Sequence, residues 1–154
     1  LRWNVSRNQF LTDTVSLTLT GSGQFASGNL DSSEKFYLGG ISGVRAYPTS
    51  ELGGERGQML SAEWRWNLAS DLVLSAFADM GRVVSLPTAL SDTSHTWQLS
   101  GHGLSLSWQS PLGLATKLVW AHRNGVNPHP SATGTDGDGT LQLNRLWLTA
   151  SWPF

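Results

Sequence analysis

The sequence contains no cysteine and few charged residues. Charged side chains make up 14% of its 154 residues, and the ten basic and eleven acidic ones leave a formal net charge of −1. Typical soluble domains carry about 25% charged residues. The lack of cysteine excludes disulfides, thiolate metal sites and a cysteine nucleophile, and the charge balance disfavours a nucleic-acid partner.

Long apolar runs are also missing. No stretch of 18 mostly apolar residues occurs, which excludes a membrane-spanning helix, and the first residues, Leu1 to Asn4, do not have the pattern of a signal peptide. Glycine and tryptophan are abundant, with 17 and 8 copies, and 39% of the residues are hydrophobic. This composition is typical of an ordered chain.

Apolar and polar residues alternate strictly in several segments, which predicts strands with one apolar face. The clearest segment places apolar side chains on one face at Leu60, Ala62, Trp64, Trp66 and Leu68. The same period recurs in the segments 15–19, 72–80, 104–108, 114–120 and 146–154. Together with a short opening segment near Trp3, the pattern predicts an all-β chain of seven strands.

The connections between these segments alternate between short and long. Short ones fall at 8–13, 69–70 and 110–112, and long ones at 27–56, 82–95 and 124–139. Antiparallel up-and-down barrels of the bacterial outer membrane have this arrangement, with charges confined to the inner face. Charged residues do lie on the polar face, at Glu63, Arg65, Asp79, Lys117 and Arg145. A soluble antiparallel barrel with the same core is the alternative.

Seven strands cannot close a transmembrane barrel, because the unpaired edges would lie in lipid. We therefore expect residues 1–154 to be the C-terminal part of a larger transmembrane β-barrel. Trp64, Trp66, Trp108 and Trp152 approach the ends of their strands next to the short connections, as in an aromatic girdle.

The long connection at 27–56 carries a motif. It includes Gly39 and Gly40, followed by Val44-Arg45-Ala46-Tyr47. This segment resembles the conserved loop of two-partner-secretion transporters, the haemolysin secretion and activation family of the Omp85 superfamily, in which the motif reads Val-Arg-Gly-Tyr/Phe. Ala46 departs from the usual glycine, and alanine tolerates a positive φ poorly. Phe77-Ala78-Asp79-Met80-Gly81 is similar to a second family segment.

The resemblance implies that this chain forms the last seven strands of a sixteen-stranded barrel. Upstream of Leu1 it implies POTRA domains and a plug helix. It also implies that the loop at about 27–56 folds into the lumen and that Arg45 contacts acidic residues on the wall. Strand parity alone places Glu63 and Asp79 on the lumen side, where a guanidinium would find carboxylates. The alternative is that Arg45 is a solvated loop residue.

The chain ends in an alternating apolar segment. The resemblance assigns an assembly signal to its C-terminal residues Leu148, Trp152 and Phe154, read by the barrel-assembly machinery. The segment Asp136-Gly137-Asp138-Gly139 lacks the remaining ligands of a calcium loop, so we interpret it as a turn.

These features favour an outer-membrane pore that secretes a large partner exoprotein such as a haemolysin or adhesin. The expected partners are that exoprotein, the barrel-assembly machinery and outer-membrane lipid, with no nucleic acid. We expect no catalytic residue, metal or cofactor. Two other classes remain open, an Omp85-type barrel assembly or insertion factor and an outer-membrane enzyme with its site at the extracellular rim.

Overall fold

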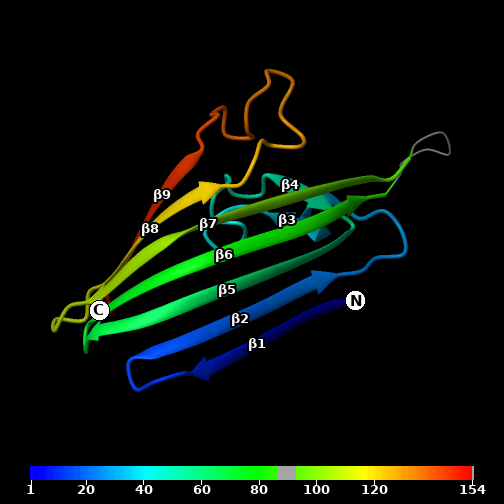
Figure 1. Cartoon of the computed structure of the whole chain (residues 1–154). Coiled ribbons are helices and arrows are strands. Elements are labelled where there is room, and N and C mark those ends of the chain that lie inside the picture. The colour runs from blue at the N-terminus through cyan, green and yellow to red at the C-terminus, as the bar shows by residue number, and fades with distance from the viewer. Residues whose placement is uncertain (87–92, 154) are drawn as a thin grey trace.

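A computed structural model describes residues 1–86 and 93–153 of the chain. Seven strands form one antiparallel sheet in the order β1-β2-β5-β6-β7-β8-β9 (Figure 1). Their bounds are β1 Arg2–Phe10, β2 Val15–Gln24, β5 Arg56–Ala69, β6 Leu72–Ser85, β7 His95–Gln109, β8 Ala115–Arg123 and β9 Asn144–Ser151. The all-β class and the seven-stranded up-and-down topology are confirmed. β1 and β9 are the two edges, so the sheet is an open, curved wall.

The connections are sorted by length as the sequence predicts. Figure 1 shows tight connections at one end of the strands and the long ones at the other, which we call the loop end. The long loop between β2 and β5 contains a short 3-10 helix, η1 Ser32–Glu34, and a hairpin of β3 Phe36–Leu38 with β4 Leu52–Gly54. Sequence alternation does not predict this hairpin, because three-residue strands are too short to show a period.

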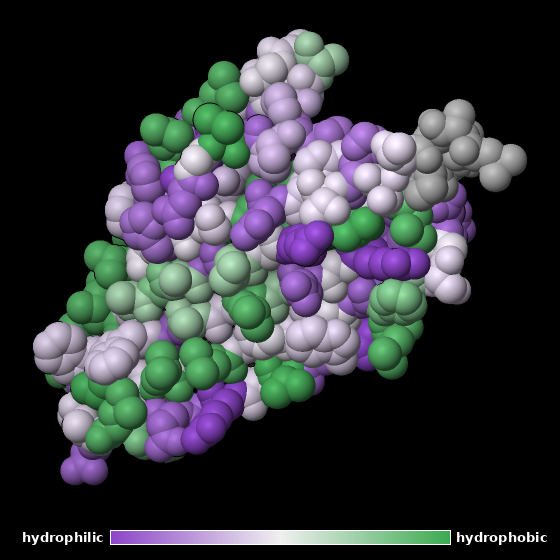
Figure 2. All heavy atoms as spheres, turned by 45° about the vertical axis from the view of Figure 1, so that its right-hand side comes forward, coloured by the Kyte–Doolittle hydropathy of each residue, from purple (hydrophilic) through white to green (hydrophobic). Residues whose placement is uncertain are grey.

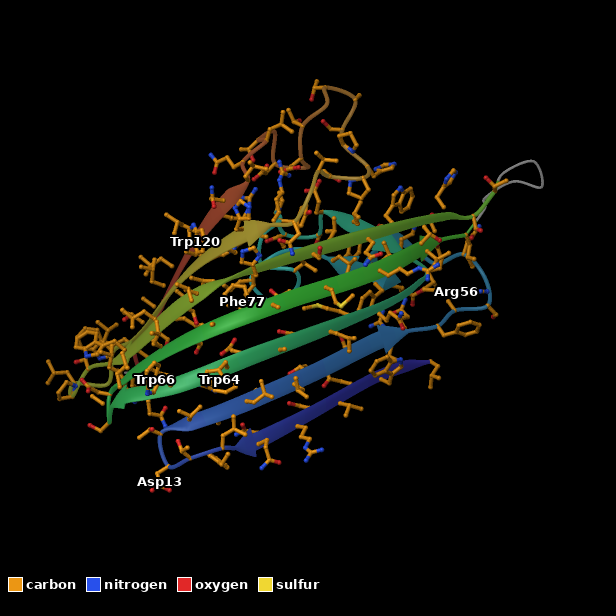
Figure 3. The ribbon with its side chains drawn as sticks, in the orientation of Figure 1. Asp13, Arg56, Trp64, Trp66, Phe77 and Trp120 are labelled. Atoms are coloured by element: carbon orange, nitrogen blue, oxygen red, sulfur yellow. The ribbon has the colours of Figure 1, made fainter. Side chains whose placement is uncertain are left out.

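One face of the sheet, which we call the outer face, is apolar and uncovered. The register aligns Trp66, Leu74, Leu106, Leu118 and Leu148 in one row across five strands. Leu60, Trp64, Trp66, Leu104 and Leu148 are all exposed. Figure 2 shows such apolar surface over large areas of the molecule, and Figure 3 places Trp64 and Trp66 toward the tight-turn end. A soluble domain rarely exposes such an apolar area.

The other face, the inner face, is covered by the long loop. The buried core consists of Leu38, Val44, Ala46, Tyr47 and Leu52 from the loop and Phe77, Val83, Leu99, Val119 and Ala121 from the sheet. Glycines on the wall allow close approach: a Cβ on Gly81 would lie 2.4 Å from Leu38 Cδ2, and one on Gly101 would lie 2.6 Å from the Ala46 Cβ. The core therefore lies between the loop and the wall.

The described part of the chain has no helix long and apolar enough to cross a membrane.

Candidate functional site

A tight turn presents Arg45 to the inner wall. Gly39 and Gly40 adopt φ values of 93° and 91°, a region that favours glycine. The turn is closed by backbone hydrogen bonds from Gly40 N to Tyr47 O at 3.0 Å and from Tyr47 N to Val44 O at 3.1 Å. Arg45 thus lies at the tip of a rigid segment.

The guanidinium of Arg45 meets both carboxylates that strand parity places on the wall. Nε and Nη2 donate to the two oxygens of Asp79 at 2.8 and 2.9 Å, and Nη1 donates to Glu63 Oε2 at 2.8 Å. The backbone N–H of Arg45 donates to Asp79 Oδ2 at 3.2 Å. Asp79 therefore holds both the side chain and the backbone of the loop tip.

Neutral groups also contact Arg45, and together with the two carboxylates they form what we call the cage. Ser61 Oγ accepts from Arg45 Nη2 at 3.2 Å and donates to Asp79 Oδ1 at 2.7 Å. The Arg45 Cζ lies 3.4 Å from the centroid of the Phe77 ring, and Trp147 Nε1 on β9 donates to the Arg45 carbonyl at 2.7 Å. Each of the three guanidinium nitrogens thus donates to at least one acceptor on the wall.

The cage keeps Arg45 charged. Burial of the guanidinium lowers its pKa, but the hydrogen bonds and charge of Asp79, followed by those of Glu63, outweigh this effect and raise the pKa above its usual value. The Arg45 side chain is 7% exposed and that of Asp79 is 1% exposed. The pair is therefore a buried, charge-assisted contact, which is stronger than a surface ion pair.

The remaining motif residues are buried around Arg45. Val44, Ala46 and Tyr47 are each at most 1% exposed. Among the described residues, Ser50 is the one non-glycine with a positive φ, so Ala46 does not occupy the left-handed region. The alanine in place of the family's glycine is accordingly compatible with the turn, and its methyl group packs against Gly101.

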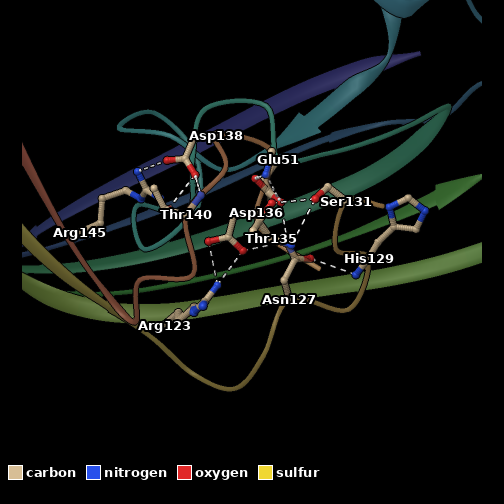
Figure 4. A network of polar contacts seen from close by, with 11 residues as sticks. Glu51, Arg123, Asn127, His129, Ser131, Thr135, Asp136, Asp138, Thr140 and Arg145 are labelled. Carbon is tan, nitrogen blue, oxygen red and sulfur yellow. Dashed lines mark hydrogen bonds and ion pairs between the residues drawn. The ribbon is translucent and has the colours of Figure 1, made fainter. Parts of the chain in front are cut away.

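A second polar network joins the long loop to the loop between β8 and β9 (Figure 4). Arg123 Nη1 donates to both oxygens of Asp136 at 2.9 and 3.0 Å, and both side chains are almost fully buried. Asn127 Nδ2 also donates to Asp136 Oδ1, at 3.1 Å, and donates to Glu51 Oε1 in the long loop. Glu51 accepts a second contact from the backbone N–H of Gly137, at 2.9 Å to Oε2.

The turn predicted at Asp136 is present, since Gly139 N donates to Asp136 O at 2.9 Å. The interpretation as a turn alone is incomplete, however, because the Asp136 side chain forms a buried ion pair. Arg123 also faces Tyr47, with Cζ 5.7 Å from the ring centroid. The second network therefore contacts the same turn that carries Arg45.

Two more ion pairs brace the loops. Lys35 Nζ lies 3.0 Å from Glu55 Oε1, and Arg145 Nη1 lies 2.8 Å from Asp138 Oδ2. Burial alone would raise the pKa of Glu55. The hydrogen bonds from the Leu86 N–H and from Lys35 have the larger, opposite effect, so the pKa lies below its usual value. For Asp138, Thr140 and Arg145 lower the pKa more than burial raises it.

The C-terminal residues assigned to an assembly signal lie apart from this site. Leu148 and Trp152 are exposed, 74% and 56%, and Leu148 belongs to the apolar row of the outer face. Phe154 lies outside the described residues.

Sequence reasoning missed several members of the two networks. Arg123, Asp136, Glu51 and Trp147 were not assigned to a site. The overlooked signal in Trp147 is its parity, because it is an aromatic residue on the polar face of β9, as Phe77 is on β6. Among the described residues, no three metal-ligating side chains gather into a cluster that could hold a metal ion.

Comparison with known proteins agrees with this architecture. The model of the Omp85 superfamily domain matches residues 2–121, so the chain belongs to the Omp85 superfamily. Three curated relatives, each called heme/hemopexin transporter protein HuxB, come from Haemophilus influenzae and two of its strains. They are 34% identical to the chain over 83 residues, which cover 51% of the chain and 15% of each relative. No solved structure matches the chain.

The superfamily recognised from the loop motif is thereby confirmed, and the similarity to HuxB supports the two-partner-secretion type. The matched region spans a small part of the length of these relatives. The name of these relatives describes them as transporters of heme and hemopexin.

Proposed function

We propose that this chain forms the C-terminal wall and the inward loop of a protein-conducting outer-membrane pore. The pore secretes a large partner exoprotein of the haemolysin or adhesin class and catalyses no chemistry. In the complete barrel of sixteen strands, POTRA domains on the periplasmic side receive the exoprotein. The contact of Arg45 with Asp79 and Glu63 carries this proposal, because it closes a reversible lock between the loop and the wall.

A gate needs an element with two stable arrangements. The long loop is suited to this role, because non-covalent contacts alone hold it on the inner face between its two ends. Buried ion pairs give the closed arrangement a defined geometry. An entering polypeptide that competes for the wall acids displaces the loop without breaking any covalent bond.

The inner wall next to the tight turns is polar. A hollow of about 350 Å³ lies there, lined among others by Arg65, Lys117, Ser107 and Thr149. Hydroxyl groups and dispersed charges suit the passage of an unfolded chain, since they offer hydrogen bonds but no continuous apolar surface to hold it. This surface supports conduction rather than storage of a small ligand.

The assembly or insertion factor of the same superfamily is the second candidate. It shares the loop motif, and the family match, which is to the Omp85 superfamily domain as a whole, is the observation that favours it. We also propose that Leu148, Trp152 and Phe154 are recognised by the barrel-assembly machinery, and that the outer face contacts outer-membrane lipid.

Photo-crosslinking in living cells tests conduction. A photoreactive residue replaces Lys117, which faces the inner side of β8, or its neighbour Leu118, which faces outward. Conduction predicts that position 117 of the complete transporter crosslinks a large polypeptide that also appears in the medium, whereas position 118 does not. Crosslinks from position 117 to other outer-membrane barrels would instead identify an assembly factor, and equal crosslinking at both positions would refute a central conduit.

A further inference from the structure

The outer face of the sheet carries a charge pattern that the apolar band does not explain. At the outward-facing positions of the seven described strands, every aspartate, glutamate, lysine or arginine is an arginine: Arg7, Arg56 and Arg82. A lipid-exposed arginine is costly at the bilayer midplane and tolerated near the headgroups. Arg56 and Arg82, near the loop ends of β5 and β6, therefore lie at a margin of the band, and their common sign indicates an anionic partner.

Two of these arginines lie together at the loop end. Arg56 on β5 pairs with Val84 on β6, and Gln58 pairs with Arg82, so the two arginines are diagonal neighbours on adjacent strands. Such diagonal positions are about 7–8 Å apart, within reach of long side chains. Figure 3 places Arg56 at this end of the sheet.

Amide side chains flank Arg82 on both sides. The register aligns Gln58, Arg82 and Gln98 in one row across β5, β6 and β7. A hollow of about 220 Å³ lies at this row, and the next outward residues toward the tight turns, Leu60 and Met80, form its other wall. One side of the hollow is thus apolar and the other offers one guanidinium and two amides.

The two arginines differ in their present contacts. Within the described residues, the exposed side chain of Arg82 has no ion-pair or hydrogen-bond partner. Arg56 is held in place, since its Nε donates to Ala26 O at 2.9 Å and its Cζ lies 4.4 Å from the Phe25 ring centroid. One guanidinium is therefore oriented in advance, and the other is free to close on a ligand.

We propose that Arg56, Arg82, Gln58 and Gln98 bind the phosphate of a lipid headgroup in the outer leaflet. Guanidinium groups bind phosphate through paired, charge-assisted hydrogen bonds, and the amides supply further donors. The acyl chains of the same lipid lie over Leu60 and Met80. A lipid is favoured over a soluble anion because the site adjoins exposed apolar surface. The proposal rests on the outer-membrane location included in the proposed function, and the outer leaflet follows from placing the long loops on the extracellular side, as in other barrels of this membrane.

The test uses the complete transporter in nanodiscs of phosphatidylcholine that contain a bisphosphorylated glycolipid or its dephosphorylated form. Native mass spectrometry counts the glycolipid retained by the protein. We expect retention of the phosphorylated form and a loss of affinity of about tenfold or more in R56Q/R82Q, because charge-assisted hydrogen bonds to phosphate are stronger than neutral ones.

R7Q is the matched control. Arg7 is also an outward arginine, but it lies on β1, away from the loop end, and its Nη2 donates to Gln9 Oε1 at 3.1 Å. R7Q should retain the glycolipid like the unchanged protein. Equal retention by R56Q/R82Q, or equal retention of the dephosphorylated lipid, would overturn the site, and full displacement by millimolar inorganic phosphate would identify a soluble anion instead. Failure of the unchanged protein to enter nanodiscs would contradict the membrane location, whereas entry without phosphate dependence contradicts only this site.

Discussion

Arg45 and Asp79 are joined by three hydrogen bonds, two from the guanidinium and one from the backbone N–H of the arginine. The carboxylate thus recognises both the side chain and the conformation of the loop tip. Because both partners are buried, loss of either one leaves a charge without compensation. This relationship makes the pair a sensitive point for testing the proposed gate.

Arg45→Ala and Asp79→Ala should each impair secretion while the barrel still assembles, because the outer face is unchanged. Removing one member of a buried pair costs about 3–5 kcal/mol, and water in the lumen reduces this value. The double variant should be less impaired than the sum of the two single variants, as expected for residues in contact. The measurement is secreted exoprotein per assembled pore.

Asp13→Ala, in the exposed turn between β1 and β2, controls for loss of an acidic residue and should have no effect. Arg45→Lys keeps the charge but not the paired hydrogen bonds, so it should restore secretion only in part. Strict additivity of the two alanine substitutions would show that Arg45 acts elsewhere.

Gly39→Ala should detach the long loop from the wall. A Cβ at this position would lie 2.2 Å from Pro48 O, and the φ of 93° is strained for alanine. The left-handed backbone alone costs about 1–2 kcal/mol. Limited proteolysis of the assembled protein should therefore cut the loop faster in Gly39→Ala than in the unchanged protein. Ala46→Gly, which restores the residue usual in the family, should differ by at most about 1 kcal/mol. Similar cleavage of both variants would contradict the role of Gly39.

Strand parity explains how much of this site could be predicted. Side chains two residues apart share a face, so the sequence alone places Glu63 and Asp79 on the lumen side of adjacent strands. The docking of Arg45 between them depends on the long loop, whose turn is set by glycines and by packing against Gly101. Its hairpin and its contact with Trp147, 102 residues away, have no local signal.

The second network, around Arg123 and Asp136, could not be predicted from the sequence for a related reason. Arg123 ends a strand and Asp136 lies in an aperiodic loop, so no period connects them. Their ion pair arises because the loop after β8 folds back over the long loop, a long-range arrangement. Residues of this kind look like ordinary turn formers in a sequence, and only their burial distinguishes them.

Acidification should break the ion pair between Lys35 and Glu55 in the long loop only well below neutral pH. The pKa of Glu55 is lowered in the folded protein, so its ion pair with Lys35 contributes fully above the ordinary glutamate pKa of about 4.3 and is lost as the pH falls through the lower folded value. Protease sensitivity of the long loop should stay constant from pH 7 to about 5 and rise below about 4. Glu55→Gln should be more sensitive already at neutral pH. A rise between pH 7 and 5 in the unchanged protein would contradict this assignment.

Asp136→Asn should loosen the loop between β8 and β9 far more than Asp138→Asn. Both residues belong to the same turn and face an arginine, but the Asp136 side chain is 1% exposed and that of Asp138 is 33% exposed. Loss of the buried charge leaves Arg123 uncompensated, which costs about 3–5 kcal/mol, whereas a partly exposed pair contributes about 0–1 kcal/mol.

Because Asn127 and Glu51 connect Asp136 to the long loop, Asp136→Asn should also increase the open-state conductance of the pore in planar bilayers, with Arg45 unchanged. Combining it with Glu51→Gln should add little, since both substitutions break the same connection. Equal conductance in the Asp136→Asn and Asp138→Asn variants would show that the second network does not hold the long loop in place.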